Sequence, residues 1–445
     1  MSLLDRRELI LGTSALFASA PSWSARRTNP FVRKVNSHFE RGGYPYRIAG
    51  TNMWYAAYLG ADGPIGNRER LKRELDRLAG LGINNVRILG SSEFSPLKNS
   101  VRPTFRNRTN HFNPALLKGL DHALAEMGKR GMTAVIYLTN FWEWSGGMMT
   151  YLYWTNGGRY VNMNDPAHPW PEFPDMSSEF YGQAAAVRMF DDYVRALVGR
   201  RNSVTGQLYR EDPAIMAWQL ANEPRPGGSN EAGRRHMQAY LGWIRASGRL
   251  IKSIDPNHLL STGSEGTQGC IDEDQCVLDA HSSPDVDYVT AHIWPQNWGW
   301  ADPKDLAGTW PTTQRKVSAY LARQVAIASR LDKPLTIEEF GYPRDGGSFD
   351  PGTTTSFRDR YYTLITGAVI DSVRSGGPLQ GCNFWAWGGE GRAQHPDHHF
   401  VRGDTSYLGD PPHEPQGWYS VFDTDASTKA VLAKYAKELK PRGRS

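Results

Sequence analysis

Short apolar runs alternate with longer amphipathic stretches along almost the whole chain, and this alternation restricts the fold more than any other feature. Apolar runs with the length and composition of buried strands lie at 46–52, 83–89, 132–138, 214–221, 258–261, 286–292, 335–338 and 381–387. Between them, apolar side chains recur at helical spacing and predict helices at 67–81, 113–130, 178–201, 231–254, 314–331 and 356–375. Strands that alternate with helices pair in parallel through right-handed crossovers. The pattern therefore predicts an α/β fold with a single closed (β/α)₈ barrel, the TIM barrel.

The length of 445 residues suits one decorated barrel, since such barrels have about 250 residues and reach 400 or more with insertions. No internal repeat or low-complexity linker divides the sequence, so we assign 26–445 to one catalytic domain. Long insertions at 140–177, 294–311 and 388–419 each follow a predicted strand. We expect them on the C-terminal face, where active sites of this fold form. The segment after the fifth strand, 263–285, has mostly loop composition.

The N-terminal residues have the pattern of an export signal. Arg6 and Arg7 precede an apolar stretch at 9–20, which is too short to span a membrane as a helix. We predict a twin-arginine signal peptide at 1–25 and a mature protein that is secreted or periplasmic and not bound to a membrane. The alternative is an amphipathic terminus that is not removed.

Cysteine content and charge restrict the environment and the partners. Cys270 and Cys276 lie six positions apart in a polar loop, so an oxidising compartment favours a disulfide between them. Cys382 lies in an apolar run and is expected to be buried and inert. The net charge of +5 comes without a long basic run, so we expect neither nucleic acid nor an acidic membrane surface as a partner.

Two predicted strands end in carboxylates. Glu223 follows the fourth strand in the segment Trp218-Gln219-Leu220-Ala221-Asn222-Glu223-Pro224, and Glu339 ends the seventh in Thr336-Ile337-Glu338-Glu339-Phe340-Gly341. The fourth and seventh strands of a barrel lie nearly opposite one another, so both carboxylates can flank one glycosidic bond. Such chemistry needs one carboxyl protonated and the other ionised, which different surroundings can provide. A single glutamate at a strand end is more often a solvated loop residue, but the pair argues against that interpretation.

These two motifs resemble glycoside hydrolase family 5, within the clan that places its acid/base after strand four and its nucleophile after strand seven. The resemblance covers most of residues 44–435. It implies that Glu223 is the acid/base and Glu339 the nucleophile. Pleating supports Glu339 over Glu338, because adjacent strand residues point to opposite sides.

Further positions match the same family. Arg87 resembles the arginine that hydrogen-bonds the nucleophile, Asn222 the amide that binds the sugar 2-hydroxyl, and His292 the histidine that orients the carboxylates. Trp385 resembles the aromatic floor beneath the cleaved sugar. Many family members have tyrosine where this chain has Trp294, which puts the usual tyrosine–nucleophile hydrogen bond in doubt.

Four segments are similar to the mannanase subgroup of the family, at 50–55, 140–147, 263–266 and 292–298. They contribute candidate sugar-binding residues, namely Trp54, Trp142, Glu265 and Trp294. Flat aromatic faces stack on pyranose rings, so the chain's fifteen tryptophans suit a sugar cleft. Candidate subsite walls, with packing between loops as the alternative role, are Trp142, Trp144, Trp154, Trp298, Trp300 and Trp310.

We therefore predict a monomeric, retaining endo-β-1,4-mannanase that acts on mannan or manno-oligosaccharides without cofactor or metal. An exo-acting β-mannosidase and another β-1,4-glycanase, such as a cellulase, are the nearest alternatives. A non-catalytic sugar-binding protein is a remote one. The last insertion contains residues of metal-binding type, but their spacing does not fit a site, and a polar loop capping the cleft is the favoured interpretation; these are His395, Asp397, His398, His399, Asp404 and His413.

Overall fold

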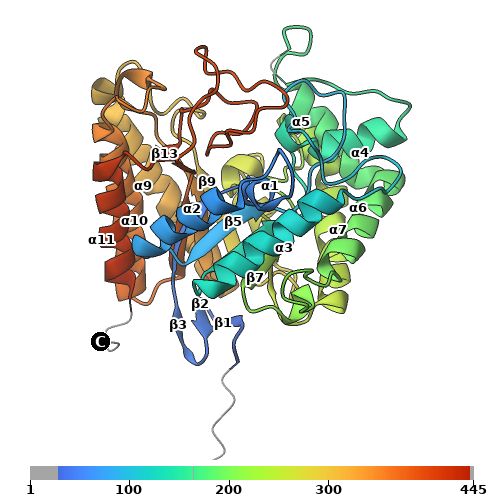
Figure 1. The fold of residues 1–445 in the computed structure, drawn as a ribbon, viewed down its shortest axis with the longest axis horizontal. Helices are drawn as coiled ribbons and strands as arrows, with labels where there is room; N and C mark the ends of the chain where they lie inside the picture. The colour runs from blue at the N-terminus through green and yellow to red at the C-terminus, as the bar shows by residue number, and fades with distance from the viewer. Residues whose placement is uncertain (1–28, 164, 441–445) are drawn as a thin grey trace, which may run out of the picture.

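An eight-stranded parallel sheet forms the centre of the protein (Figure 1). The computed structural model describes residues 29–163 and 165–440, so the predicted signal peptide at 1–25 lies outside the described residues. The spatial order of the strands is β8-β7-β6-β5-β4-β11-β10-β9. Their bounds are β4 Ile48–Asn52, β5 Asn85–Leu89, β6 Thr133–Tyr137, β7 Ile215–Gln219, β8 Leu259–Ser261, β9 Val289–Ile293, β10 Leu335–Phe340 and β11 Leu379–Phe384.

The two outer strands of this sheet, β8 and β9, approach each other and nearly close it. The Asp287 N–H donates to the Leu260 carbonyl at 2.8 Å, and the His292 N–H donates to the Glu265 carbonyl at 3.1 Å. The predicted (β/α)₈ barrel is therefore confirmed.

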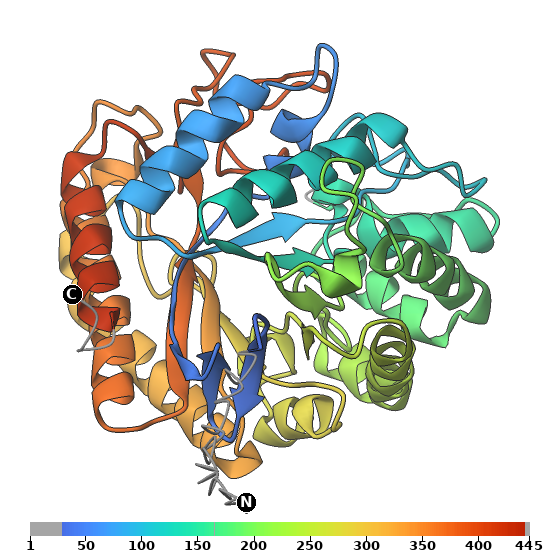
Figure 2. The ribbon, with the colours of Figure 1, turned by 60° about the horizontal axis from the view of Figure 1, so that its bottom comes forward.

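Helices surround the barrel (Figure 2). Local sequence explains where several of them start. The Asn113 side chain accepts hydrogen bonds from the N–H groups of Ala115 and Leu116, with Pro114 in the first turn. The helices are α1 Ala56–Gly60, α2 Arg68–Gly80, α3 Pro114–Lys129, α4 Gly147–Thr155, α5 Glu172–Ser177, α6 Ala184–Val198, α7 Asn230–Ile254, α8 Asp274–His281, α9 Leu306–Leu331, α10 Ser356–Arg374 and α11 Ala426–Leu439. Among the described residues, none of these helices is long and apolar enough to cross a membrane.

The structure differs from the sequence-based prediction at several helices. The segment 178–201 is a short 3₁₀ helix, Ser178–Gly182, followed by α6. Helix α9 begins at Leu306 rather than at 314. It contains Pro311, and because proline ordinarily marks a helix boundary, the predicted start lay too late in the sequence. The loop-like segment 263–285 contains α8. Cys270 before this helix and Cys276 within it form the predicted disulfide, with Cα atoms 5.6 Å apart.

A three-stranded antiparallel sheet, β1 Val32–Val35, β2 His38–Arg41 and β3 Tyr44–Tyr46, covers the N-terminal end of the barrel. Its Phe39 is fully buried and packs edge-on against Tyr288 at 5.4 Å between ring centroids. Figure 1 shows this sheet at the end of the barrel opposite to the long loops. The N-terminal end is therefore filled by packing, and the C-terminal end is left for a site.

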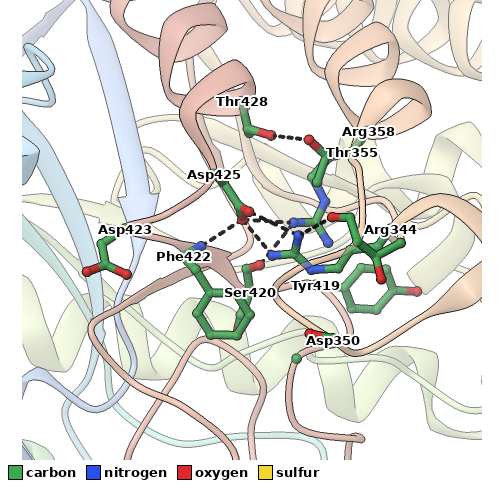
Figure 3. A network of polar contacts seen from close by, with 12 residues as sticks. Arg344, Asp350, Thr355, Arg358, Tyr419, Ser420, Phe422, Asp423, Asp425 and Thr428 are labelled. Carbon is green, nitrogen blue, oxygen red and sulfur yellow. Dashed lines mark hydrogen bonds and ion pairs between the residues drawn. The ribbon is translucent and has the colours of Figure 1, made fainter.

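The last insertion, 388–419, rises over the C-terminal face and is fastened at its base (Figure 1). The short strands β12 Trp387–Gly389 and β13 Val421–Phe422 pair in parallel and bring its two ends together. Arg358, shown beside Ser420 in Figure 3, donates to the Ser420 carbonyl at 2.9 Å. It also donates to the Trp418 carbonyl at 3.1 Å. The loop is thus held by backbone pairing and by a buried cation.

An acidic residue at the start of α11 holds this cation in turn. Asp425 forms two hydrogen bonds with Arg344 at 2.6 and 3.0 Å, and its carboxylate lies 3.6 Å from Arg358 (Figure 3). Both arginines are fully buried. The network therefore connects α10, α11 and the end of the loop into one unit.

Candidate active site

The C-terminal ends of the barrel strands open into a cavity of about 580 Å³. Three of the predicted site residues, Arg87, His292 and Trp54, do not line it. The other predicted residues do, namely Trp142, Asn222, Glu223, Glu265, Trp294, Glu339 and Trp385.

Glu223 is held by three side chains at the end of β7. Its Oε1 lies 2.6 Å from His292 Nδ1 and accepts a hydrogen bond from Trp294 Nε1 at 3.3 Å. Its Oε2 accepts from Trp142 Nε1 at 2.5 Å. The backbone of Glu223 has a φ of +51°, a region that costs energy for residues other than glycine and is often found at functional sites. The geometry therefore fixes the direction of this carboxylate.

Glu339 lies on β10 and contacts a buried arginine. Arg87 Nη1 donates to Glu339 Oε1, and His292 Nδ1 lies 3.2 Å from Glu339 Oε2. The same guanidinium donates to Gln219 Oε1 at 2.8 Å and to Asn222 Oδ1 at 2.8 Å. Arg87 is fully buried and therefore acts as a fixed cation beneath Glu339, the contact that the family resemblance implied.

The two carboxylates are close to each other. One oxygen of Glu223, one oxygen of Glu339 and one ring nitrogen of His292 all lie within 4.8 Å of one another. Glycosidases that retain anomeric configuration have carboxyl groups about 5–5.5 Å apart, and inverting enzymes about 6.5–9.5 Å. The limit of 4.8 Å between single oxygens lies nearer to the retaining separation than to the inverting one.

Glu338 takes a different position from Glu339. It accepts hydrogen bonds from Gln219 Nε2 at 2.5 Å and from Tyr288 Oη at 3.0 Å, and it does not line the cavity. Burial raises the pKa of its carboxyl. A register shift between Ile337 and Glu339 interrupts the pairing of β10 with β9, which lets both consecutive carboxylates approach Arg87. Simple pleat alternation therefore does not hold here, although only Glu339 reaches the cavity.

Glu223 and His292 shift each other's pKa in opposite directions. Burial raises the pKa of the Glu223 carboxyl, but the hydrogen bond and charge of His292 outweigh burial and lower it to about 2. Burial lowers the pKa of His292, but the charges of Glu339 and Glu223 raise it to about 10. The 2.6 Å hydrogen bond between His292 Nδ1 and Glu223 Oε1 is a direct path for a proton between the two groups.

Arg225, two residues after Glu223, joins the site although the sequence analysis did not single it out. It forms a bidentate pair with Glu265, at 2.5 and 2.8 Å, and its guanidinium lies 4.9 Å from the Trp142 ring centroid. Burial raises the pKa of Glu265 to about 7, against the lowering effect of Arg225. Glu265 therefore reaches the cavity as one half of an ion pair, and only its position beside the motif Asn222-Glu223-Pro224 could have drawn attention to Arg225.

The candidate tryptophans divide into two groups. Trp142, Trp144 and Trp298 line the cavity, whereas Trp154, Trp300 and Trp310 do not. Trp54 is also away from the cavity, because it is buried and its Nε1 donates to the Gly409 carbonyl at 3.1 Å. Trp54, Trp154 and Trp310 are buried and Trp300 is partly buried, and all four pack against the core. Their sequence segments alone do not distinguish them from the tryptophans that line the cavity.

The last insertion contributes residues to the cavity, but its histidines do not converge on a metal position. His395 pairs with Asp404 at 3.0 Å, and His398 lies 2.8 Å from the Gln416 carbonyl oxygen. His413 instead lines the cavity with Glu414 and Trp418. The expected capping loop is therefore present, and it also provides charged side chains.

Comparison with known proteins agrees with this geometry. The family model described as GH family 5 beta-mannosidase-like matches residues 29–443. A crystal structure of a glycoside hydrolase family 5 mannosidase from Rhizomucor miehei is 34% identical, covers 92% of this chain and 97% of that chain, and superposes with a TM-score of 0.83. The same protein has also been crystallised in complex with mannosyl-fructose.

Plant proteins are similar as well. Mannan endo-1,4-beta-mannosidase 1 of Oryza sativa subsp. japonica is 28% identical over 92% of this chain and 86% of its own length. The protein of the same name from Arabidopsis thaliana is 26% identical over 80% of this chain and 81% of its own length. The chain therefore belongs to the beta-mannosidase-like group of glycoside hydrolase family 5 and is a glycoside hydrolase.

Proposed function

We propose that this protein is a retaining endo-β-1,4-mannanase that hydrolyses internal β-1,4-mannosidic bonds of mannans. The observation that carries the proposal is the pair Glu223 and Glu339, whose nearest oxygens lie within 4.8 Å at the floor of a tryptophan-lined cavity. The printed activities of the plant relatives and of the Rhizomucor miehei mannosidase support mannose as the sugar.

The mechanism follows from the positions of the two carboxylates. Glu339, paired with Arg87, attacks the anomeric carbon and forms a glycosyl ester while the glycosidic bond breaks. Glu223 gives a proton to the leaving oxygen, after receiving it from His292 through their hydrogen bond. In the second step Glu223 removes a proton from water, and the water oxygen attacks the ester and releases Glu339.

Sugar binding is assigned to the polar and aromatic groups around this pair. Asn222 donates to Asn140 and accepts from Arg87, so its amide is fixed beside the catalytic residues for contact with the 2-hydroxyl. Trp385 is the proposed floor under the cleaved sugar. Trp294 directs its N–H to Glu223, so at this position the hydrogen bond serves the acid/base and not the nucleophile.

A digest of linear mannan tests the proposal. We expect manno-oligosaccharides of several lengths early in the digest, with the β-anomer formed first in proton NMR spectra. An initial α-anomer would contradict the nucleophile role of Glu339, because a single displacement inverts the configuration. A parallel digest of cellulose should proceed much more slowly, and the reverse preference would favour the cellulase alternative.

An exo-acting β-mannosidase is a second candidate. Two observations favour it: the similar Rhizomucor miehei structure is titled a mannosidase, and the insertion 388–419 carries His413 and Glu414 into the cavity. This enzyme would release mannose alone from the start of the digest. A non-catalytic sugar-binding protein would bind oligosaccharide without any product, which the presence of both carboxylates argues against.

We propose that no metal takes part. Glu223, His292 and Glu339 are ligand types within 4.8 Å of one another, but the Arg87 guanidinium already contacts Glu339 and would repel a second cation. Activity should therefore be unchanged after dialysis against EDTA, and loss of activity that a divalent metal restores would contradict this view.

Export and a monomeric state remain part of the proposal. Arg6, Arg7 and the apolar stretch 9–20 support a twin-arginine signal, and the disulfide Cys270–Cys276 fits a secreted or periplasmic location. The mass of the exported protein should correspond to cleavage near residue 25.

A further inference from the structure

A buried cluster of charges lies at the cavity wall, apart from the catalytic pair. Glu143 comes from the loop after β6, and His413 and Glu414 come from the insertion 388–419. His413 lies between the two carboxylates, with Nδ1 3.5 Å from Glu143 and Nε2 3.7 Å from Glu414. Their side chains are only 2%, 13% and 12% exposed, in the order Glu143, His413 and Glu414. The mechanism described above uses none of them.

Several polar atoms of this cluster have no hydrogen-bond partner among the described residues. These atoms are both carboxylate oxygens of Glu143, His413 Nδ1 and Glu414 Oε2. Buried polar groups are nearly always hydrogen-bonded, so unpaired ones at a cavity indicate a ligand or solvent that completes them. His413 and Glu414 line the cavity, whereas Glu143 lies behind them. Glu414 Oε2 is itself closed off from solvent, so a ligand in the cavity reaches this carboxylate through Oε1, the oxygen 3.7 Å from His413.

Aromatic contacts place the cluster relative to the catalytic pair. His413 packs edge-on to Trp144 with ring centroids 6.4 Å apart, and Trp144 packs on Trp385 at 6.5 Å. Trp385 then packs on Trp294 at 5.9 Å, and Trp294 donates to Glu223. The contacts thus form a row from His413 through Trp144, Trp385 and Trp294 to Glu223, and the charged cluster lies at the end of this row opposite to Glu223.

The charge of Glu339 contributes to the raised pKa of Glu414. Burial raises the pKa of Glu414 to about 7, and the charges of Asp410 and Glu339 add to the increase while His413 opposes it. Burial lowers the pKa of His413, but Glu143 and Glu414 raise it to about 10. Glu414 lines the same cavity as Glu339, and His413 lowers the pKa of the Glu414 carboxyl.

A purely structural role does not account for this arrangement. The contacts of 3.5 and 3.7 Å are too long for good hydrogen bonds, so the cluster adds little to the hold on the loop. The loop is already fastened by β12, β13 and Arg358.

We propose that Glu414, supported by His413 and Glu143, accepts hydrogen bonds from hydroxyl groups of the sugar bound on the nucleophile side of the cleaved bond. This inference rests on the proposed function, because it assumes that the cavity binds a glycoside there. A carboxylate accepts only, and it can take two neighbouring hydroxyls at once. Glu414 would therefore determine which sugar, with which free hydroxyls, is accepted at that position.

The test measures how much each sugar hydroxyl contributes to kcat/KM in enzymes with and without the Glu414 carboxylate. The substrates are 4-nitrophenyl β-D-mannopyranoside and its 3-, 4- and 6-deoxy analogues, and the enzymes are the wild type and Glu414→Gln. For the wild type, we expect kcat/KM to fall about 10- to 100-fold for at least one deoxy analogue, because a hydrogen bond to a charged group is lost. In Glu414→Gln that difference should shrink to within about 3-fold.

Asp397→Asn is the matched control, because Asp397 lies on the same insertion with a side chain that is 69% exposed. It should keep the wild-type pattern. Equal losses on all substrates in Glu414→Gln would indicate a structural role only and would overturn the inference. If Glu414→Gln does not fold, the wild-type scan decides, since no loss with any deoxy analogue would overturn the inference by itself.

The outcome for the proposed function is separate. Should the wild type hydrolyse another glycoside better than the mannoside, mannose specificity fails and the comparison is repeated with deoxy analogues of that glycoside. A wild type without activity on any glycoside in the panel and on linear mannan would overturn the proposed function and the inference with it. An active wild type with an unchanged pattern in Glu414→Gln would overturn the inference alone.

Discussion

Arg87 connects most of the residues that the proposed mechanism needs. Its guanidinium is fully buried and contacts Glu339, Gln219 and Asn222 at the same time. A planar donor with fixed geometry can hold these partners in one arrangement, which a flexible lysine could not do. The direction of the Glu339 carboxylate is therefore set by one side chain that lies below the cavity rather than in its wall.

We predict that Glu223→Gln and Glu339→Gln each lower kcat on mannan at least about 1,000-fold without unfolding the protein. General acid–base catalysis alone contributes about 10²–10⁴-fold, and loss of the nucleophile costs at least as much. Steady-state kinetics and circular dichroism measure both effects. Glu338→Gln is the control, because Glu338 has the same chemistry but lies outside the cavity, and it should retain most activity. If Glu338→Gln were the more damaging change, the assignment of the nucleophile would be wrong.

Trp170 is predicted to bind a sugar at the rim of the cavity. It is 62% exposed, lines the cavity and lies nearly parallel to Trp142, with ring centroids 6.4 Å apart. Because Trp142 donates to the acid/base, Trp170 lies on the leaving-group side. Trp170→Ala should raise KM for mannohexaose about 5- to 10-fold through lost stacking.

The aryl mannoside serves as the internal control for Trp170→Ala, since its leaving group is too short to reach the rim. Its KM should stay unchanged. A similar increase for both substrates would mean that Trp170 acts on the loop and not on the sugar.

At the scale of the elements, the network in Figure 3 connects the end of the insertion 388–419 to α10 and α11. Asp425 is the only acidic residue that the recorded ion pairs of the described residues assign to Arg344 and Arg358. A buried cation that loses its partner is strongly destabilising. The position of Trp418 in the cavity wall therefore depends on Asp425 at the start of α11, which holds Arg358 in place.

Asp425→Ala should lower the free energy of unfolding by about 3–5 kcal/mol, because it leaves two buried arginines without their carboxylate. Urea denaturation measures this loss. Asp423→Ala is the matched control, as Asp423 pairs with Arg392 at 2.7 Å and both side chains are partly exposed. A surface pair of this kind contributes about 0–1 kcal/mol, so equal effects of the two changes would contradict the importance of the network.

His281 at the end of α8 should make stability depend on pH. It is fully buried, contacts Thr262 Oγ1 at 2.9 Å and the Val277 carbonyl at 2.8 Å, and burial lowers its pKa to about 4. An unfolded histidine has a pKa of about 6.5, so between these values the unfolded chain binds more protons. The folded protein therefore loses about 3 kcal/mol of stability from this residue as the pH falls from about 6.5 towards 4.

Urea denaturation at pH 7 and pH 4.5 checks this expectation. His281→Gln should show a smaller difference between the two pH values than the wild type, since the titrating group is gone. His399→Gln, with a side chain that is 76% exposed, provides the comparison and should behave as the wild type. A wild-type difference that persists in His281→Gln would assign the pH dependence to other residues.

For the whole molecule, the two ends of the barrel have different tasks. The N-terminal end is filled by β1–β3, whereas the C-terminal end carries the cavity and the long loops (Figure 1). Phe39→Ala should lower the free energy of unfolding by about 3–5 kcal/mol through the cavity that it leaves. The kcat of the folded variant should stay within about 2-fold of the wild type, because packing at this end does not touch the site. A large loss of kcat in folded Phe39→Ala would show that the two ends are coupled.

Several features of the fold and site follow from local patterns in the sequence. The alternation of short apolar runs with stretches of helical periodicity predicts strands and helices one by one, and eight such units leave few arrangements other than a closed barrel. Glu223 and Glu339 were identifiable because each ends a buried strand, and strand ends of a parallel barrel meet at one face. Arg87 was identified by its resemblance to the family arginine, and its place within an apolar strand argued against a surface position.

The remaining features depend on contacts between distant segments. Trp54 and Trp142 both lie in segments similar to mannanases, yet one packs a loop and the other contacts Glu223. Loop side chains lack a repeating period, so their direction depends on where the loop is fastened. For the insertion 388–419 those anchors are β12, β13, Arg358 and Asp425. Only the tertiary structure therefore brings Glu414 to the cavity, because long-range packing rather than local pattern determines the path of the chain.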